Sequence, residues 1–111
     1  FLKLELKDNN YDGIFANASL FHVPSQELPR VLRDLHTALR KDGILFSSNP
    51  RGNAEGWQGQ RFGHYMEIEA SETFLEQSGF RIIEHYYRPP GKPREQQPWL
   101  AIVSQRQDLK Q

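Results

Sequence analysis

Residues 11–49 read YDGIFANASLFHVPSQELPRVLRDLHTALRKDGILFSSN and contain a short apolar run, an amphipathic segment and a second apolar run. Residues 14–16 are apolar without alternation, which is typical of a strand covered on both faces. The amphipathic segment places its large apolar side chains at the spacing of one buried helix face. These side chains are Leu28, Val31, Leu32, Leu35 and Leu39. With a second strand over residues 44–48, the pattern predicts a right-handed parallel crossover and therefore an α/β fold.

Local signals bound the predicted helix at both ends. Ser25 is an N-cap candidate, and Pro29 is tolerated only in the first turn of a helix. The run Lys41-Asp42-Gly43 predicts the end of the helix, with Gly43 in the left-handed conformation that glycine adopts readily.

The segments on either side of this unit are less regular. Residues 1–7 alternate partly between apolar and charged side chains, as expected of an edge strand or an extended arm. Residues 50–65 are rich in Gly, Arg and Gln without periodicity and predict a long loop. Ser71 is expected to cap a short second helix that Gly79 closes.

The C-terminal third predicts two more strands. Residues 81–87 carry apolar and aromatic side chains, and so do residues 99–104. Residues 89–93 between them contain three prolines and predict a stiff loop outside the sheet. We therefore expect the two strands to pair antiparallel, and we expect residues 1–111 to form one domain.

The composition narrows the possible classes of function. Fourteen Lys and Arg balance fourteen Asp and Glu, so no net field attracts nucleic acid or an anionic membrane. The absence of cysteine excludes disulfides and thiolate metal sites and fits a cytoplasmic protein. No apolar run is long enough to span a bilayer. We expect no metal site, because the four histidines lack the spacing of a ligand motif. They are His22, His36, His64 and His85.

The motifs of this chain resemble those of a known enzyme family when they are taken in order. YDGIFA at residues 11–16 followed by SLFHVP at 19–24 is similar to the fourth strand and cofactor-side loop of class I S-adenosylmethionine-dependent methyltransferases. LRKDGIL at 39–45 resembles the family's next motif, with Asp42 in place of one glycine. The stretch from Tyr65 to Phe80 resembles the helix that follows the family's variable substrate loop.

The resemblance implies a fold, a reaction and a set of site residues. The fold would be a partial Rossmann-like sheet with parallel strands, a C-terminal antiparallel pair and helices packed on the sheet. The reaction would transfer a methyl group from S-adenosylmethionine to a small-molecule acceptor, with His22 as the candidate catalytic base. The residues bordering the cofactor would be Asn17, Ala18, Ser19 and His22. The residues bordering the acceptor would be Arg61, His64 and Tyr65.

One part of the family's pattern has no counterpart in this chain. The glycine-rich loop after the first strand is missing, and so is the acidic residue that binds the ribose. The glycines at 52, 56, 59 and 63 lack the strand-to-helix setting of that loop. We therefore expect a C-terminal portion of a methyltransferase domain without its glycine-rich half. Such a portion would be inactive alone and would bind S-adenosylmethionine weakly or not at all.

Simpler interpretations stand beside these roles. Asn17 and Ser19 are also typical of a turn after a strand, and the ring of His22 is as well suited to bonding that turn. Arg51 and Arg61 are candidates to bind an anion, or they belong to a solvated loop. For His36 and His85, packing is the favoured interpretation.

Two other functions remain open at the sequence level. The chain could be a non-catalytic α/β module that forms a homodimer through an exposed sheet edge at residues 14–16. The three cations of residues 88–94 are a weaker indication of nucleic-acid binding, because aromatic side chains are sparse among them.

Overall fold

The structure is a computed structural model that describes residues 11–17, 20–52, 55–58 and 61–108. The predicted arm at residues 1–7 and two predicted cofactor-side residues, Ala18 and Ser19, lie outside these ranges. The side chains of Asn17 and Arg61 are also outside the description, although their backbones are within it.

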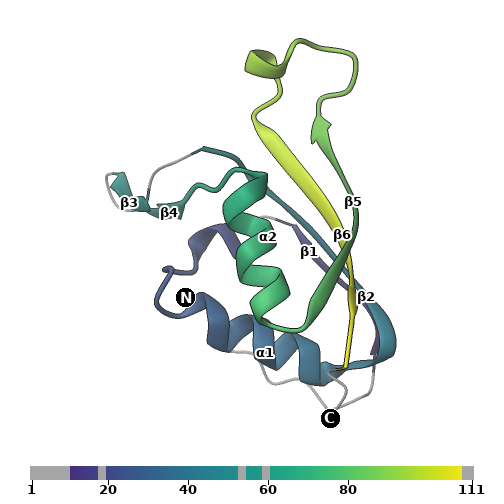
Figure 1. The fold of residues 1–111 in the computed structure, drawn as a ribbon. Helices are drawn as coiled ribbons and strands as arrows, with labels where there is room; N and C mark the ends of the chain where they lie inside the picture. The colour runs from purple at the N-terminus through teal and green to yellow at the C-terminus, as the bar shows by residue number, and fades with distance from the viewer. Residues whose placement is uncertain (1–10, 18–19, 53–54, 59–60, 109–111) are drawn as a thin grey trace.

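A four-stranded sheet in the order β1-β2-β6-β5 forms the centre of the molecule (Figure 1). Strand β1 (Tyr11–Asn17) pairs parallel with β2 (Leu39–Pro50), which confirms the predicted crossover. Strand β5 (Phe80–Arg88) pairs antiparallel with β6 (Trp99–Arg106), which confirms the predicted C-terminal pair. Strand β6 lies between β2 and β5 and is antiparallel to both.

Two helices, α1 (Leu28–Ala38) and α2 (Ile68–Gln77), cover one face of this sheet (Figure 1). The α1 side chains predicted to form a buried face are buried, and Leu39 is buried as the first residue of β2. They share one core with Ala16, Leu45 and Ile102 of the sheet and with Leu75 of α2. The apolar spacing of α1 therefore determines which side of the helix meets the sheet.

Both predicted N-caps are wrong. The N-cap residue of α1 is Glu27 and makes no side-chain capping bond, whereas the Ser25 N–H donates to a distant carboxylate. The carbonyl of Pro24 accepts hydrogen bonds from the N–H groups of Glu27 and Leu28, so a backbone turn leads into the helix. Ser71 lies inside α2, where it is buried.

The junction between α1 and β2 differs from the prediction: the helix ends at Ala38, and the predicted stop at residues 41–43 lies inside β2. Asp42, not Gly43, has the left-handed conformation, with φ of 63°. Asp tolerates this region better than most residues, and it stands where the resemblance has a glycine. Gly43 is needed for space, because a Cβ there would lie 2.8 Å from the carbonyl oxygen of Arg40.

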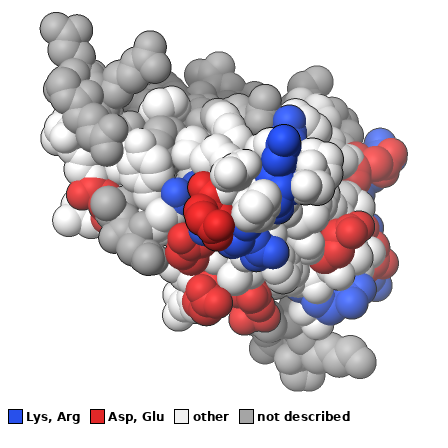
Figure 2. Space-filling model, turned by 90° about the horizontal axis from the view of Figure 1, so that it is seen from above, with Lys and Arg blue, Asp and Glu red and all other residues white. Residues whose placement is uncertain are grey.

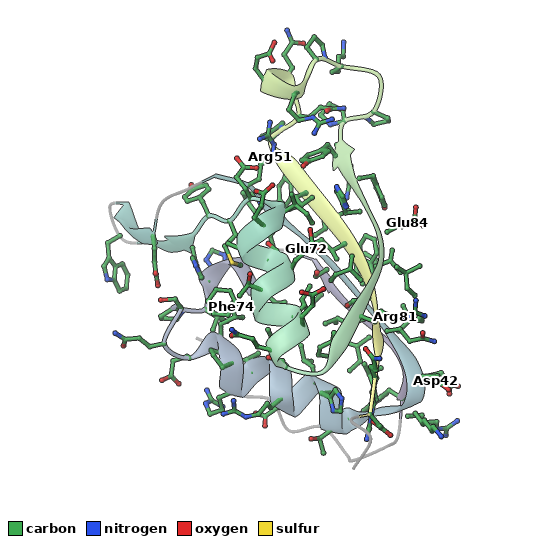
Figure 3. All side chains as sticks on the ribbon, viewed as in Figure 1. Asp42, Arg51, Glu72, Phe74, Arg81 and Glu84 are labelled. Carbon is green, nitrogen blue, oxygen red and sulfur yellow. The ribbon has the colours of Figure 1, made fainter. Side chains whose placement is uncertain are left out.

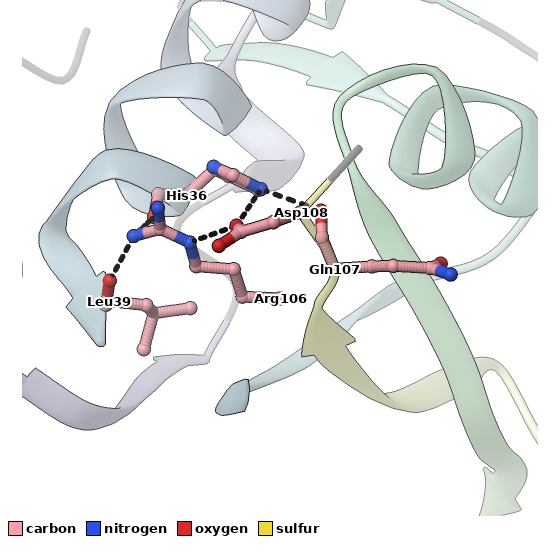
Figure 4. Close-up of polar contacts among 5 residues, drawn as sticks. All are labelled: His36, Leu39, Arg106, Gln107 and Asp108. Atoms are coloured by element: carbon pink, nitrogen blue, oxygen red, sulfur yellow. Dashed lines mark hydrogen bonds and ion pairs between the residues drawn. The ribbon is translucent and has the colours of Figure 1, made fainter. Parts of the chain in front are cut away.

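Residues near the C-terminus of the described chain cap the C-terminal end of α1 (Figure 4). The Arg106 guanidinium donates to the carbonyls of His36 and Leu39, which have no partner inside the helix. Arg106 also donates to the Asp108 carboxylate at 2.9 Å, which holds the pKa of that carboxyl below its usual value. The positive side chain at the negative end of α1 stabilises the helix.

His36 packs in this region, as predicted. Its ring meets Phe80 edge-on with centroids 5.5 Å apart, and its Nε2 lies 3.2 Å from the carbonyl oxygen of Gln107. Gly79 ends α2 with φ of 92°, which confirms its predicted role, and its missing side chain leaves room for the His36 ring. His36 therefore joins the ends of both helices to β6.

Residues 50–65 are not an irregular loop, which corrects the sequence prediction. Strands β3 (Glu55–Gln58) and β4 (Arg61–His64) form an antiparallel hairpin beside the main sheet (Figure 1). Two glycines, Gly56 and Gly63, face each other in the pair. The two strands are four residues long and each contains a glycine, so they show no apolar alternation. Hydrophobic periodicity therefore did not indicate strands here.

Candidate active site at the carboxyl ends of the parallel strands

The parallel strands β1 and β2 end at the same edge of the sheet. Asn17, the last residue of β1, is paired with Ser48 near the end of β2. The short 3-10 helix η1 (Leu20–His22) follows β1, and His22 is exposed on it. Open α/β sheets bind ligands outside the carboxyl ends of their parallel strands, so this edge is the candidate site.

The β3–β4 hairpin contacts the segment that follows β1. Strand β4 contacts η1, and the Ser25 N–H donates to the Glu55 carboxylate at 2.7 Å. This bond lowers the pKa of Glu55, and the nearby His64 adds a smaller Coulombic contribution in the same direction. Glu55 and His64 are opposite each other in the hairpin register. An ionised carboxylate thus attaches the hairpin to the loop between β1 and α1.

His64 and Tyr65 lie at the end of this hairpin, next to the sheet edge. His64 is buried, and its ring meets Phe74 of α2 edge-on with centroids 5.8 Å apart. Among the described residues, no group bonds the buried Nδ1 of His64. Tyr65 packs closely against Gly52: a side-chain Cβ added at Gly52 would lie only 3.0 Å from the Cβ of Tyr65. The hairpin is therefore held close to the end of β2.

A small cleft of about 20 Å³ lies between η1, the two helices and strands β2 and β6. Its apolar lining is Leu20, Leu28, Leu32, Met66, Phe74, Leu75 and Ile102. Its polar lining is Ser47, Asn49 and Ser71. The Oδ1 atom of Asn49 is buried and accepts no hydrogen bond from the part of the chain that the structure describes. Unpaired buried acceptors are rare in proteins, so a donor from outside the described residues is expected here.

Arg51 does not serve as a free anion-binding group, although the sequence made it a candidate. Its Nη1 donates to both oxygens of Glu67, at 3.1 and 3.2 Å, and its Nε donates to the carbonyl of Gln97 at 2.6 Å. Its Nη2 donates to the carbonyl of Arg94. Figure 3 shows Arg51 where the β5–β6 hairpin leaves the sheet. The carboxylate that this arginine binds is the protein's own.

Comparison with known proteins agrees with this architecture. Residues 1–47 match a family model described as a methyltransferase domain, and no curated protein matches the sequence. The fold is similar to that of the 1,6-didemethyltoxoflavin-N1-methyltransferase of Burkholderia thailandensis, with a TM-score of 0.78 at 21% identity over 94% of this chain. A similar fold occurs in an S-adenosylmethionine-dependent methyltransferase from Mesorhizobium loti, with a TM-score of 0.74 at 17% identity over 94% of this chain. Another from Methanosarcina mazei has a TM-score of 0.75 at 13% identity over 95% of this chain.

The described residues have the fold of class I methyltransferases. The chain spans 48%, 65% and 63% of the length of the three solved chains, in the order given. The Burkholderia structure contains bound 1,6-didemethyltoxoflavin and S-adenosylhomocysteine.

The structure brings only some of the predicted site residues together. His64 and Tyr65 lie beside the cleft, and His22 is on η1, whose Leu20 lines it. His85 lies on β5, where its ring contacts Tyr87, so it belongs to another part of the molecule. Asn17 ends β1 as predicted, and its role stays a prediction.

Sequence reasoning missed Glu55 and Phe74. Glu55 lies in the segment that was predicted to be a loop, where it bonds the Ser25 N–H, and Phe74 lines the cleft from α2. For Ser71, the signal was a polar side chain one turn into an apolar helix face, but it was interpreted as a cap. No sequence signal indicated Glu55, since its partner is 30 residues away.

Charge is mixed around the end of the β5–β6 hairpin. Seen from above, acidic and basic side chains alternate there and neither sign forms a continuous patch (Figure 2). Among the described residues, no group of three or more acidic, His or Cys side chains could hold a metal ion. None of the helices in the described ranges has the length and apolar character required to cross a membrane.

Proposed function

We propose that this chain is the acceptor side of a methyltransferase domain that transfers a methyl group from S-adenosylmethionine to a small molecule. The observation that supports this most is the cleft near the carboxyl end of β2, where the Oδ1 of Asn49 has no partner among the described residues. Small-molecule sites are lined mostly by apolar side chains with a few polar groups, as this lining is.

In this proposal, the segment after β1 borders the methionine part of the cofactor. It comprises Asn17, Ala18, Ser19 and His22. Bound S-adenosylmethionine supplies the electrophilic methyl group. In this proposal, His22, which is exposed, accepts a proton from the acceptor. Arg61, His64 and Tyr65 would border the acceptor itself. Alignment of acceptor and methyl group supplies most of the rate enhancement in such a site.

The proposal includes a limit on the isolated chain. Because no glycine-rich strand-to-helix loop occurs in residues 1–111, the adenosine part of the cofactor has no binding loop here. We propose that catalysis belongs to a longer cytoplasmic parent protein, and that the isolated chain contacts the cofactor weakly and only through its homocysteine side.

Saturation-transfer NMR with S-adenosylhomocysteine tests this proposal. The homocysteine protons should receive more saturation from the 111-residue chain than the adenine protons do. His22→Ala should reduce the transfer at least about threefold, since one hydrogen bond contributes a factor of this size. His85→Ala, an exposed histidine on β5, is the matched control and should change nothing. Saturation centred on adenine, or none at millimolar ligand, would contradict the proposal.

A second candidate function is supported by the two edges of the sheet. Among the described residues, no strand pairs with the outer side of β1, and residues 13–17 contain no charge, proline or bulge. Strand β5, at the opposite edge, has a register irregularity between Ile82 and Glu84 and charged side chains, including Arg81 and Glu84 (Figure 3). Bulges and charges protect sheet edges from pairing, so β1 is the unprotected edge.

The face of the sheet next to this edge is also apolar. Phe15 alternates with the core residues Ile14 and Ala16 and therefore points away from the helices. Its ring is stacked on Phe46 with centroids 4.6 Å apart and remains 68% exposed. We infer that β1 pairs with β1 of a second copy, which would bury this aromatic stack in a homodimer.

Sedimentation velocity tests the homodimer. The wild-type chain should dimerise at micromolar concentration, and Phe15→Lys should shift the dissociation constant by at least about tenfold, because burying one aromatic side chain is worth roughly 1.5–3 kcal/mol. Ile83→Lys, which changes an exposed apolar side chain on β5, should leave it unchanged. A concentration of 200 µM is roughly a hundred times a micromolar dissociation constant. A wild-type chain that stays monomeric at this concentration excludes the homodimer.

A further inference from the structure

We infer that the acceptor is an uncharged, flat molecule that inserts one O–H or N–H group into the cleft at Asn49. This inference rests on the proposed methyl transfer and names the chemical class of the acceptor. It follows from three properties of the cleft: which lining residues are accessible, how much space lies behind them, and which charges are present.

The accessible lining residues form the mouth of the cleft. Asn49, Met66 and Phe74 are partly exposed, whereas the other lining residues are buried. Figure 3 shows Phe74 projecting from α2 on the side of the β3–β4 hairpin. A thioether and an aromatic ring at the mouth make favourable contacts with a planar aromatic ligand.

The space behind the mouth admits only a small group. The cleft measures about 20 Å³, which is enough for one group the size of a water molecule. The buried Oδ1 of Asn49 is an acceptor without a described partner, and Ser47 and Ser71 are the other polar residues of the lining. A hydroxyl or an N–H group fits both the size and the missing donor, while the ring that carries it stays between Met66 and Phe74.

The described charges around the cleft disfavour an anionic acceptor. None of the lining residues is charged. The nearest cation in sequence, Arg51, uses its guanidinium to bind Glu67 and two carbonyl groups. Glu55 is ionised, because the Ser25 N–H stabilises its charged form, and it lies on the hairpin that carries His64. A carboxylate or phosphate placed here would lose its hydration without gaining a charged partner among the described lining residues.

Titration of the ¹⁵N-labelled 111-residue chain with phenol, toluene and benzoate tests the inference. Phenol should give saturable shifts at the amides of Asn49, Ser71 and Phe74. Toluene, which lacks the donor, should bind at least about fivefold more weakly, because the acceptor would remain unpaired. Benzoate should give no saturable shift at these amides. Binding of benzoate or toluene as tightly as phenol, or shifts confined to other parts of the chain, would overturn the inference.

Variants add a second comparison that is independent of wild-type binding. Asn49→Leu keeps the side-chain volume and should abolish the preference for phenol over toluene, while Thr73→Val, on the exposed side of α2, should preserve it. If Asn49→Leu does not fold, the three-ligand comparison on the wild type still decides. The cofactor experiment has a separate readout. Homocysteine contacts without phenol binding would refute the acceptor class alone, and phenol binding without homocysteine contacts would refute methyl transfer alone.

Discussion

Replacement of Arg51 by Ala should lower the free energy of unfolding by about 3 kcal/mol, because it breaks a half-buried ion pair and removes the hydrogen bonds that Arg51 donates to the carbonyls of Gln97 and Arg94. The Arg51 side chain is 17% exposed and that of Glu67 is 26% exposed, so water replaces the lost bonds only in part. The same guanidinium also lies 5.3 Å from the centre of the Tyr87 ring. For a domain of this size, the loss corresponds to a decrease in Tm of roughly 10–20 °C.

Urea unfolding and hydrogen exchange measure this effect globally and locally. Arg51→Lys should recover less than half of the loss, since an ammonium group cannot make the forked set of bonds. Arg81→Ala is the matched control: Arg81 is exposed, and its single described bond is to Gln105. We expect that control to stay within about 0.5 kcal/mol of wild type. Exchange at the Gln97 amide, which bonds the carbonyl of Arg94, should accelerate in Arg51→Ala. Equal stabilities for Arg51→Ala and Arg81→Ala would show that Arg51 does not hold the β5–β6 hairpin.

Replacement of Gly43 by Ala should cost about 2–3 kcal/mol, because the added methyl group would overlap backbone atoms that cannot move aside cheaply. Its Cβ would lie 2.8 Å from the carbonyl oxygen of Arg40 and 3.1 Å from that of Asp12. These two residues are also joined by an ion pair of 3.2 Å across the same junction. The junction would have to open to admit the methyl group, and the first pairs of β1 with β2 would weaken.

Gly13 provides the control for this change. It lies in β1 opposite Ile44, and a Cβ there would be 3.6 Å from the nearest atom, which is an ordinary contact. Gly13→Ala should therefore be neutral or slightly stabilising, since glycine inside a strand costs roughly 0.5–1 kcal/mol relative to alanine. Thermal unfolding of both variants decides the matter. If Gly13→Ala is as destabilising as Gly43→Ala, the close approach at residue 43 is not the reason that a glycine is there.

The predictions that succeeded rest on patterns contained within one segment. The spacing of Leu28, Val31 and Leu32 predicted the buried face of α1, and the apolar run before Ser48 predicted β2. The caps at Ser25 and Ser71 failed for a different reason: the same residue types also bond distant groups or fill a core, and local sequence does not distinguish these outcomes. The hairpin at residues 55–64 was not predicted, because each of its short strands is stable only when it pairs with the other.

The candidate site was predictable to the same extent. The carboxyl ends of β1 and β2 follow from the crossover, and with them the neighbourhood of Asn17 and Asn49. The cleft beside Asn49 does not follow, because its lining comes from five separate elements. The sequence also could not predict that Arg51 binds groups of the protein itself, because these partners are 16, 43 and 46 residues away.

By itself, the sequence determined the α/β class of this chain, the parallel crossover and the edge of the sheet where a ligand would bind. These features depend on periodicity and on turn residues, which act over a few neighbouring positions. Only the tertiary structure decided which side chains are available for chemistry at that edge. A guanidinium, an amide or an imidazole is free or engaged according to what the rest of the chain places beside it. The pairing of Arg51 with Glu67 and the unpaired oxygen of Asn49 are the two instances that matter most for function.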